Sequence, residues 1–324
     1  PLLLDLHYIE SLLQDLMGSD SVLVTGGAGF IGHYLTSALL SQGRRVVVLD
    51  DFSSGLPLPS HPLLTVISGD IADSSVREKA LNQVTSVINL AAIASVPLCE
   101  NKPKLSSRIN FFAAQDLFTE ASKLGVSAII QASTSALYGV PNQLPLIEES
   151  SIQPIGNYGL DKQRAEDSLL SIRNTPVCSL RLFNVFGVGQ KRDSPYSGVL
   201  TIFSDGIRNE KPLRIFGDGT QSRDFVHVKD VVSAFIGCLE ELEKNGLNSI
   251  ISGNKFNVCS GKSMTLLEIV EAFSQFSNNE IDIVFESPRE GDILHSLGSF
   301  DSLNKAIGWT PSQNFTANLQ ELLL

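Results

Sequence analysis

Short apolar runs and amphipathic stretches alternate along the first half of the chain. The apolar runs are rich in β-branched residues and too short for buried helices. They predict strands at Val22–Thr25, Val46–Asp50, Leu64–Gly69, Ser86–Leu90, Ala128–Ala132 and Val177–Leu182. The stretches between them predict helices, at Gly32–Ser41, Ser74–Asn82, Arg108–Leu124 and Tyr158–Arg173. Near-continuous apolar strands that alternate with helices indicate an α/β fold, a Rossmann-type doubly wound parallel sheet covered on both faces.

The pattern changes after residue 182, where Gly- and Pro-containing loops separate shorter strands and helices. One of these helices begins with a capping box, Thr265–Glu268. The change predicts a first domain at 21–182, to which elements around 224–260 return. A smaller α/β domain is predicted to occupy most of 183–324.

Residues 1–20 place Leu6, Ile9, Leu13 and Leu16 at helical spacing, which predicts an amphipathic helical extension. Its polar face is acidic, so packing on the protein is favoured over a role at a membrane surface. The net charge of −11 argues against nucleic acid as a partner, because phosphate backbones bind clustered Lys and Arg. No membrane span and no signal peptide are evident, so we expect a cytoplasmic protein without a membrane partner.

The placement of cysteine and histidine bears on metal sites and disulfides. Cys99, Cys178, Cys238 and Cys259 lie far apart and form no CxxC pair, and the five histidines are scattered. We therefore expect buried thiols in a reducing compartment, and no metal ion.

The stretch VLVTGGAGFIG, residues 22–32, is the strongest candidate for binding a cofactor. Gly26, Gly29 and Gly32 are spaced three apart, between a predicted strand and a predicted helix. Glycines there allow a tight turn and the close approach of a pyrophosphate, and the start of the helix offers N–H groups to phosphate. With an acidic residue about 20 positions later, the pattern is typical of a dinucleotide-binding loop.

Asp50 is that acidic residue, at the end of RRVVVLD. A carboxylate at the tip of the second strand accepts both ribose hydroxyls of NAD and repels the extra phosphate of NADP, which favours NAD. The alternative is a solvated loop aspartate, because Asp51 is adjacent. At the end of the third strand, Asp70 and Ile71 suit the edge and the face of an adenine ring.

Tyr158 and Lys162 in YGLDK are placed to lie on one face of a helix. An ammonium group near a phenol stabilises the phenolate and typically shifts a pKa by about 1–3 units. Moving the pKa of a tyrosine from about 10 to about 7 takes roughly 4 kcal/mol. Lys162 together with the positive nicotinamide ring of bound NAD is expected to supply it. The alternative is a surface Tyr–Lys pair, since the chain has five tyrosines.

In their order along the chain, these motifs resemble those of the extended short-chain dehydrogenase/reductases, and among them the NAD-dependent nucleotide-sugar epimerases. The resemblance runs from Val22 to about Pro311 and includes TGGAGFIG, LDDFSSG, GDIAD, INLAAIASV, STSALYG, YGLDK, RLFNVFG, IFGDGTQSRDFVHVKDV and REGDILHS. It implies that 21–182 binds NAD and that 183–324 binds most of a nucleotide sugar. The NAD-binding residues that it implies are Gly26, Gly29, Phe30, Ile31, Gly32, Asp50, Ser53, Gly55, Asp70, Ile71, Leu90, Ala91, Ala92, Asn110, Tyr158 and Lys162.

The resemblance also implies the chemistry. It makes Tyr158 the catalytic base, Lys162 its activator, and Thr134 the residue that hydrogen-bonds the 4-hydroxyl of the sugar. Sugar dehydratases place Asp and Glu directly after this Thr, and decarboxylases keep the Glu, whereas this chain has Ser135 and Ala136. No side chain remains there to drive elimination, so we expect oxidation followed by reduction, which is an epimerisation.

Ser296 is the most informative residue for the choice of sugar. Epimerases restricted to UDP-glucose and UDP-galactose carry a tyrosine at this place in the motif, whereas a serine leaves room for an N-acetyl group and favours UDP-GlcNAc and UDP-GalNAc. Epimerisation of UDP-glucose or of a UDP-hexuronic acid stays an alternative, and a non-catalytic NAD-binding sensor is a second one. The resemblance also implies a homodimer. The substrate-binding residues that it implies are Ser95, Thr134, Ser135, Asn184, Val199, Leu200, Ile215, Phe216, Arg223, Arg289, Asp292 and Ser296.

Overall fold

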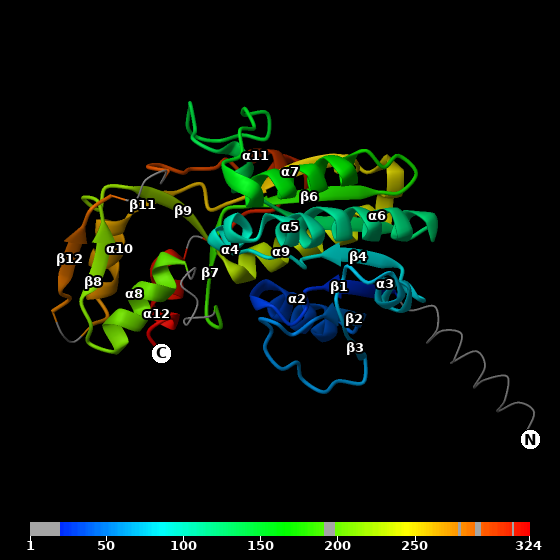
Figure 1. Ribbon diagram of the computed structural model, residues 1–324, viewed down its shortest axis with the longest axis horizontal. Coiled ribbons are helices and arrows are strands. Elements are labelled where there is room, and N and C mark those ends of the chain that lie inside the picture. Colours follow the sequence, from blue (N-terminus) through cyan, green and yellow to red (C-terminus); the bar gives the residue numbers. More distant parts are fainter. Residues whose placement is uncertain (1–19, 191–197, 278–279, 289–292, 313) are drawn as a thin grey trace, which may run out of the picture.

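A seven-stranded sheet forms the main body of the computed structural model, and a smaller lobe lies at one end (Figure 1). The structure describes residues 20–190, 198–277, 280–288, 293–312 and 314–324. The helix expected at 1–20 therefore lies outside the described residues, apart from residue 20. The same holds for two expected substrate contacts, Arg289 and Asp292.

All seven strands of the main sheet are parallel, in the order β10–β6–β5–β4–β1–β2–β3. Their chain order reverses between β1 and β4, and ligands of such sheets bind beyond the carboxyl ends of the strands at this point. The doubly wound fold and its first six strands are as predicted. The strands are β1 (Ser21–Thr25), β2 (Arg45–Asp50), β3 (Leu64–Ser68), β4 (Ser86–Asn89), β5 (Ala128–Thr134), β6 (Val177–Leu182) and β10 (Asn254–Val258).

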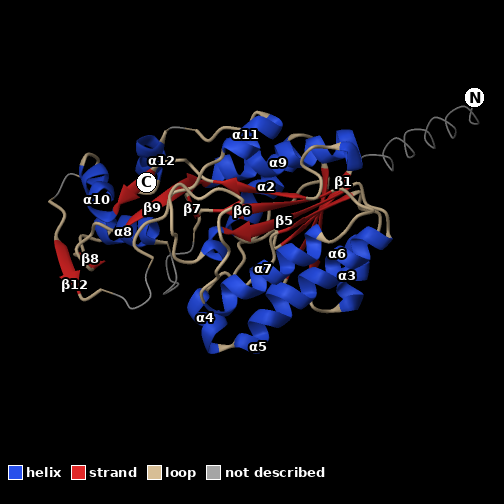
Figure 2. Ribbon diagram, turned by 90° about the horizontal axis from the view of Figure 1, so that it is seen from above, coloured by secondary structure: helices blue, strands red, loops and turns tan. Residues whose placement is uncertain are grey.

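Helices cover both faces of this sheet, which explains why its strands are apolar on both sides (Figure 2). One face carries α2 (Phe30–Ser41), α9 (Val228–Asn245) and α11 (Asp301–Ile307). The other face carries α3 (Ser74–Leu81), a π-helical segment η1 (Ser107–Ala113), α6 (Ala114–Lys123) and α7 (Gly156–Leu170). The single helix expected at 108–124 is thus divided into η1 and α6. Shorter elements near the sheet are α4 (Val96–Asn101), α5 (Pro103–Ser106), η2 (Ser135–Tyr138) and η3 (Gly246–Asn248).

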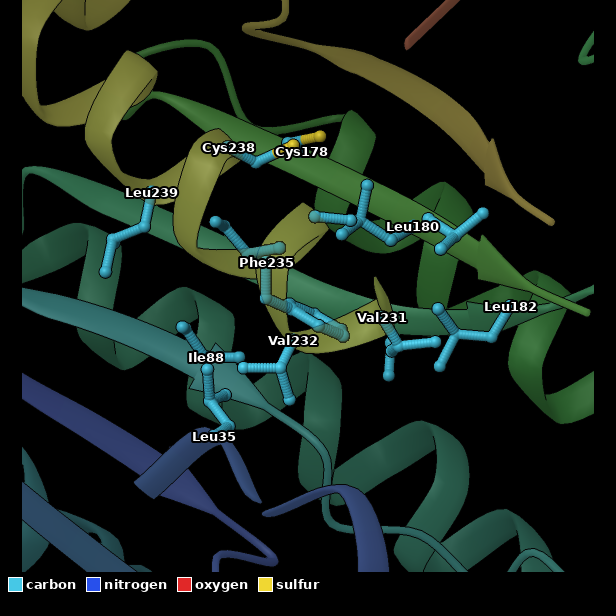
Figure 3. Packing of buried hydrophobic residues seen from close by; sticks show 14 of the residues in the cluster. Leu35, Ile88, Cys178, Leu180, Leu182, Val231, Val232, Phe235, Cys238 and Leu239 are labelled. Atoms are coloured by element: carbon cyan, nitrogen blue, oxygen red, sulfur yellow. The ribbon is translucent and has the colours of Figure 1, made fainter. Parts of the chain in front are cut away.

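The core beneath α9 joins residues from distant parts of the sequence. Phe235 of α9 packs with Ile88 of β4 and Leu180 of β6 (Figure 3). Cys178 and Cys238 lie side by side in the same cluster, and all four cysteines are free and buried. Because α9 and β10 follow the first part of the lobe in the chain, the chain returns from the lobe to complete the main body.

The lobe contains a three-stranded sheet in the order β11–β9–β7 and a two-stranded sheet of β8 and β12. Since β7 follows β6 directly and β9 leads into α9, Asn184 and Arg223 are carried to the carboxyl edge of the main sheet. The predicted capping box of Thr265 and Glu268 is present at the start of α10. The elements are β7 (Asn184–Phe186), α8 (Val199–Arg208), β8 (Leu213–Phe216), β9 (Ser222–His227), β11 (Ser263–Thr265), α10 (Leu266–Ser274), β12 (Ile283–Glu286) and α12 (Phe315–Glu321).

Candidate active site

The glycine loop between β1 and α2 has no room for a side chain at two positions. Gly26 has φ +67°, and a Cβ there would lie 2.8 Å from the main-chain nitrogen of Ala91. A Cβ on Gly32 would lie 2.1 Å from the carbonyl oxygen of Gly26. Gly29 caps α2 without a side-chain hydrogen bond, so the first N–H groups of the helix, those of Phe30 onwards, are available to a phosphate.

Asp50, at the end of β2, ties the glycine loop to the loop that follows β2. Its Oδ2 accepts a hydrogen bond from the N–H of Ala28 (2.9 Å), and its Oδ1 accepts one from the main chain two residues later (2.8 Å). Gly55 packs against the same alanine, since a Cβ on Gly55 would lie 2.7 Å from the Cβ of Ala28. Ser53 is exposed, and its hydroxyl donates to Asp51 (2.6 Å). A direct hydrogen bond thus connects the dinucleotide motif to its acidic residue, Asp50.

The two residues expected to contact the adenine, Asp70 and Ile71, differ in the exposure of their side chains. The Oδ2 atom of Asp70 is paired with Arg108 at 2.6 Å, and both side chains are partly exposed. The side chain of Ile71 is only 6% exposed and packs in the core, which leaves little of it for contact with a ring. At this end of the site, the accessible groups are therefore the Asp70–Arg108 pair and the main chain.

Asn110 fixes the loop that follows β4. This buried amide accepts a hydrogen bond from the N–H of Ile93 (2.7 Å) and donates one to the carbonyl of the same residue (3.1 Å). Leu90, Ala91 and Ala92, which precede Ile93, are half-buried in front of the glycine loop, where Ala91 is the residue that a Cβ on Gly26 would meet. Asn110 thus holds this side of the expected NAD site in place through the main chain.

Tyr158 and Lys162 lie one turn apart on α7, opposite the end of β5. Lys162 is buried, and its ammonium group donates to the carbonyl oxygen of Ala132. Thr134, at the end of the same strand, hydrogen-bonds to the phenol of Tyr158 and accepts from the N–H of Ala136 (3.1 Å). The structure therefore brings the three expected catalytic residues together.

Burial decides the charge states of these groups. It raises the pKa of Tyr158, which the nearby thiol of Cys99 also raises and the hydrogen bond to Thr134 partly lowers. It lowers the pKa of Lys162 to about 8, against the opposing effect of the Glu166 carboxylate. The protein alone therefore does not produce the lowered pKa that the sequence predicts for the Tyr158 phenol. Lowering it depends on a further positive charge in the site.

A pocket of about 420 Å³ opens in front of Tyr158 and Thr134. We call it the sugar pocket, after the ligand that the sequence predicts for it. Ser296 is 9% exposed, lies in its wall, and is held through its main chain by Ser222, which accepts from its N–H at 3.0 Å. The residues that line the pocket are Val96, Thr134, Ser135, Ala136, Gly139, Pro141, Leu146, Ile155, Tyr158, Leu182, Phe183, Asn184, Arg223, Ile293, His295 and Ser296.

A second pocket of about 420 Å³ lies in the lobe, and Arg223 lines both. Val199 and Phe216 line this second pocket, whereas Leu200 and Ile215 are buried in the core of the lobe beneath it. Of the expected nucleotide-binding residues, the structure thus brings Arg223, Val199 and Phe216 to one surface. Leu200 and Ile215 support that surface from below.

The two remaining expected contacts have structural partners of their own. Ser95 caps α4 by accepting a hydrogen bond from the N–H of Leu98 (3.1 Å), next to Val96 in the wall of the sugar pocket. The Nδ2 of Asn184 donates to the carbonyl of Asp224 (2.9 Å). Within the described ranges, no group of three or more His, Cys, Asp or Glu side chains could hold a metal ion. The same residues include no helix that is long and apolar enough to span a membrane.

Comparison with known proteins decides the family. Residues 22–259, which include the glycine loop, Thr134, Tyr158 and Lys162, match the NAD dependent epimerase/dehydratase family. The chain belongs to this family. The predicted family, the predicted cofactor NAD and the predicted class of enzyme, an isomerase, are confirmed with it.

Relatives of this epimerase-family chain differ in their sugars. The UDP-N-acetylglucosamine 4-epimerase of Methanobrevibacter ruminantium M1, in complex with UDP-N-acetylmuramic acid, is 34% identical with a TM-score of 0.86, over 94% of this chain and 97% of that one. The UDP-glucose 4-epimerase of Streptococcus mutans is 30% identical over 90% of this chain and 92% of its own. The UDP-glucuronic acid 4-epimerase of Bacillus cereus, in complex with UDP-glucuronic acid and NAD, is 25% identical with a TM-score of 0.84, over 94% and 98%.

Sequence reasoning missed one residue of the sugar pocket, His295, and the buried carboxylate that follows Arg223, Asp224. His295 lies in the wall of the sugar pocket, and its Nδ1 is 3.0 Å from the hydroxyl of Ser222. Asp224 is buried beside Arg223 and accepts hydrogen bonds from Ser260 and from the N–H of Gly298 (3.1 Å). The available signal was adjacency, because each residue is next to a predicted contact in a matched motif.

Proposed function

We propose that the protein is an NAD-dependent 4-epimerase of UDP-hexoses that interconverts UDP-GlcNAc and UDP-GalNAc. The observation that carries the choice of sugar is the position of Ser296. Its small, buried side chain lies in the wall of the same pocket as Thr134 and Tyr158, so the pocket keeps room for an N-acetyl group. A tyrosine side chain at this position would project into that room.

The two pockets suit the two ends of a nucleotide sugar. Arg223 lies where they meet, and its planar guanidinium can bond two oxygens of a diphosphate at once. The sugar then lies against Thr134 and Tyr158, and the uracil lies against Val199 and Phe216. In this arrangement the diphosphate is bound at Arg223, between the sugar and the uracil.

In the proposed reaction, Tyr158 accepts the proton of the 4-hydroxyl, directly or through Thr134, and later returns it. Lys162 contributes its positive charge to the phenolate. The glycine loop and Asp50 would hold NAD, which would supply the group that accepts and returns a hydride. Ser135 and Ala136 provide no acid or base for elimination, so the 4-keto sugar is reduced again.

Two other sugars remain alternatives, each named by a relative. UDP-glucose fits the pocket as well, because a site with room for an N-acetyl group also has room for a hydroxyl. A UDP-hexuronic acid carries a carboxylate in addition to the diphosphate, and this second anion would need a positively charged partner of its own. Arg223 is the only Arg or Lys among the described residues that line the sugar pocket, and the diphosphate engages it. A non-catalytic sensor would not require both Tyr158 and Lys162.

The expected homodimer and cytoplasmic location stay predictions. Dimer contacts are expected on the helices at 108–124 and 158–173, by analogy with the family. Phe112 and Leu160 are large apolar side chains that are about half exposed on η1 and α7, and they support this surface. Sedimentation of the purified protein tests the dimer, and a Leu160→Glu variant should shift it to the monomer.

A substrate panel tests the proposed function. The purified protein should contain NAD and interconvert UDP-GlcNAc and UDP-GalNAc without added reductant. Ser296→Tyr should abolish turnover of the N-acetylated sugars and keep turnover of UDP-glucose. The matched control is Ser41→Tyr, an exposed site at the end of α2, which should change neither.

Each other outcome of this panel would replace part of the proposed function. Turnover of UDP-glucose alone, or of a UDP-hexuronic acid alone, would replace the N-acetylated substrate. Equal activity of Ser296→Tyr and wild type on UDP-GlcNAc would remove the role of Ser296. A protein that binds NAD and turns over none of these sugars would be a sensor.

A further inference from the structure

The catalytic helix α7 carries a third polar residue on its buried face. Tyr158, Lys162 and Glu166 follow at intervals of four, so all three lie on the face that packs on β5 and β6. Glu166 is only 2% exposed. An isolated carboxylate at such depth would be very unfavourable, so its partners have to be found in the core.

Two residues of β6 hold this carboxylate. Arg181 donates from Nη2 to Oε1 at 2.6 Å, and from Nε to Oε1 and Oε2 at 3.1 and 3.2 Å. Ser179 donates its hydroxyl to Oε2 at 2.9 Å. The carboxylate of Glu166 is therefore fixed to the sheet, and with it the turn of α7 that follows Lys162.

The guanidinium of Arg181 is also fixed from its other side. Its Nη1 donates to the hydroxyl of Tyr138 and to the carbonyl of Glu148, both at 3.0 Å. A buried ion pair of this kind often contributes little net stability compared with apolar residues of the same volume. Its position beside the catalytic lysine offers a functional reason for keeping it.

The surroundings of Lys162 make Glu166 its principal anion. Its own hydrogen-bond acceptor, the carbonyl of Ala132, is neutral. Other titratable groups on this side are Tyr158 on α7, Cys99 on α4 and Arg181 on β6, and none of them is an anion near neutral pH. The carboxylate of Asp167, next to Glu166 on α7, is exposed and interacts with Glu166 and Arg181. Asp161, also on α7, is bonded to Ser106 and Ser107, on the side of α5 and η1.

We propose that Glu166, clamped by Arg181, is a positioning residue that keeps the buried ammonium of Lys162 charged beside Tyr158. The clamp prevents the carboxylate from moving to Lys162 and pulling its ammonium away from Ala132. Lys162 therefore stays aligned with the phenol while it receives the field of a fixed negative charge. The consequence for catalysis rests on the proposed function, but the charge of Lys162 does not.

The test follows the titration of Lys162 itself. Lysine side chains of the purified protein are labelled with ¹³C at Cε, and the signal of Lys162 is identified by its loss in Lys162→Met. In Glu166→Gln, the midpoint of this titration should fall by about one pH unit, the lower end of the effect of an adjacent opposite charge. In Glu166→Asp, which keeps the charge, it should stay closer to that of the wild type.

A matched control lies on the opposite face of the sheet. Glu243 of α9 is likewise bonded by both terminal nitrogens of an arginine, Arg44 (3.0 and 2.7 Å), and by a serine hydroxyl, that of Ser86 (2.7 Å). Glu243→Gln should leave the midpoint of Lys162 unchanged. If Glu166→Gln does not fold, the double variant Glu166→Gln/Arg181→Gln, which strands neither charge, should also lower the midpoint, by less than Glu166→Gln because a cation is removed with the anion.

A midpoint that does not move in folded Glu166→Gln, or that moves equally in Glu243→Gln, would overturn the proposal. Turnover of UDP-sugars is measured on the same samples, where the alkaline limb of the pH profile should move with the midpoint. If the midpoint moves but no UDP-sugar is turned over, the proposed function fails and the positioning role stands. If sugars are turned over and the midpoint is unchanged, only the positioning role fails.

Discussion

Lys162 lies one helical turn beyond Tyr158, yet its ammonium group is bonded to the main chain of β5, at Ala132. The phenol is bonded to Thr134, two residues further along that strand. The end of β5 therefore sets the positions of both functional groups, and the helix brings them to it. This arrangement requires a charged amine in the core, which is unfavourable for stability.

Replacing Lys162 by Met should therefore abolish turnover and stabilise the fold. The pKa of Lys162 falls from 10.5 to about 8 on folding, so the folded state binds fewer protons between these values. The cost of burying the charge is fully present below pH 8 and disappears as the pH rises toward 10.5. We expect Lys162→Met to raise the free energy of unfolding at pH 7 by up to about 3 kcal/mol.

Urea titrations at several pH values check this prediction. The gain in stability should shrink between pH 8 and pH 10. Lys229→Met is the control, because Lys229 is exposed and paired with Glu321 at 3.3 Å, and it should change stability by less than about 1 kcal/mol. A loss of stability in Lys162→Met at pH 7 would contradict the prediction.

Thr134→Val should make the phenol harder to ionise. The hydrogen bond from Thr134 lowers the pKa of Tyr158, so its loss lets burial raise that pKa further. We expect kcat at pH 7 to fall about 10- to 100-fold, the value of one hydrogen bond to a charged group, and the acid limb of the pH profile to move to higher pH. Thr134→Ser keeps the hydroxyl and should keep the profile. If Thr134→Val had the same pH profile as the wild type, the role of Thr134 in ionising Tyr158 would be contradicted.

Gly32→Ala should remove NAD from the protein. Its Cβ would lie 2.1 Å from the carbonyl oxygen of Gly26, so the glycine loop has to move. Gly43→Ala is the control, because Gly43 has φ +77° and nothing within 4 Å of its Cβ, and the change adds only backbone strain of about 1–2 kcal/mol. Nucleotide released on denaturation measures the outcome. Wild-type NAD content in Gly32→Ala would show that the loop tolerates the shift.

Arg223→Lys should weaken the binding of the nucleotide sugar without loss of NAD. Lysine keeps the charge but cannot bond two diphosphate oxygens in one plane, so we expect KM and the inhibition constant of UDP to rise about 10-fold or more. Arg208→Lys serves as the control in the same lobe, since Arg208 lines neither pocket and its charge pairs with Asp205 on the same helix (3.8 Å). Unchanged inhibition by UDP would place the diphosphate elsewhere.

The sequence predicted the parts of the site that depend on local spacing. Gly26, Gly32 and the pair Tyr158–Lys162 each lie within one motif, so period and position along the chain were sufficient. The Glu166–Arg181 pair was not predicted, because its partners belong to different elements and Arg181 lies in an apolar strand. The burial that raises the pKa of Tyr158 was not predicted for a similar reason, since it depends on the packing of the whole chain around the phenol. The lowered pKa expected with bound NAD stays a prediction.

Two further differences between prediction and structure concern the side chain of Ile71 and the helix expected at 108–124. Ile71 follows a strand end, where the sequence does not determine which way a side chain turns, and its side chain is in the core. The helix expected at 108–124 contains the π-helical segment Ser107–Ala113, whose hydrogen-bond pattern leaves no signature in an apolar spacing.

Among the described residues, the hydrogen bonds of Ser296 are made by its main chain: its N–H donates to the carbonyl of Ser222, and its carbonyl accepts from Ser263 (3.1 Å). Such bonds form with any side chain at that position. If Ser296 selects the sugar as proposed, a single substitution at this position should exchange one sugar preference for another with little effect on folding. Closely similar homologues that differ here are then expected to act on different UDP-sugars.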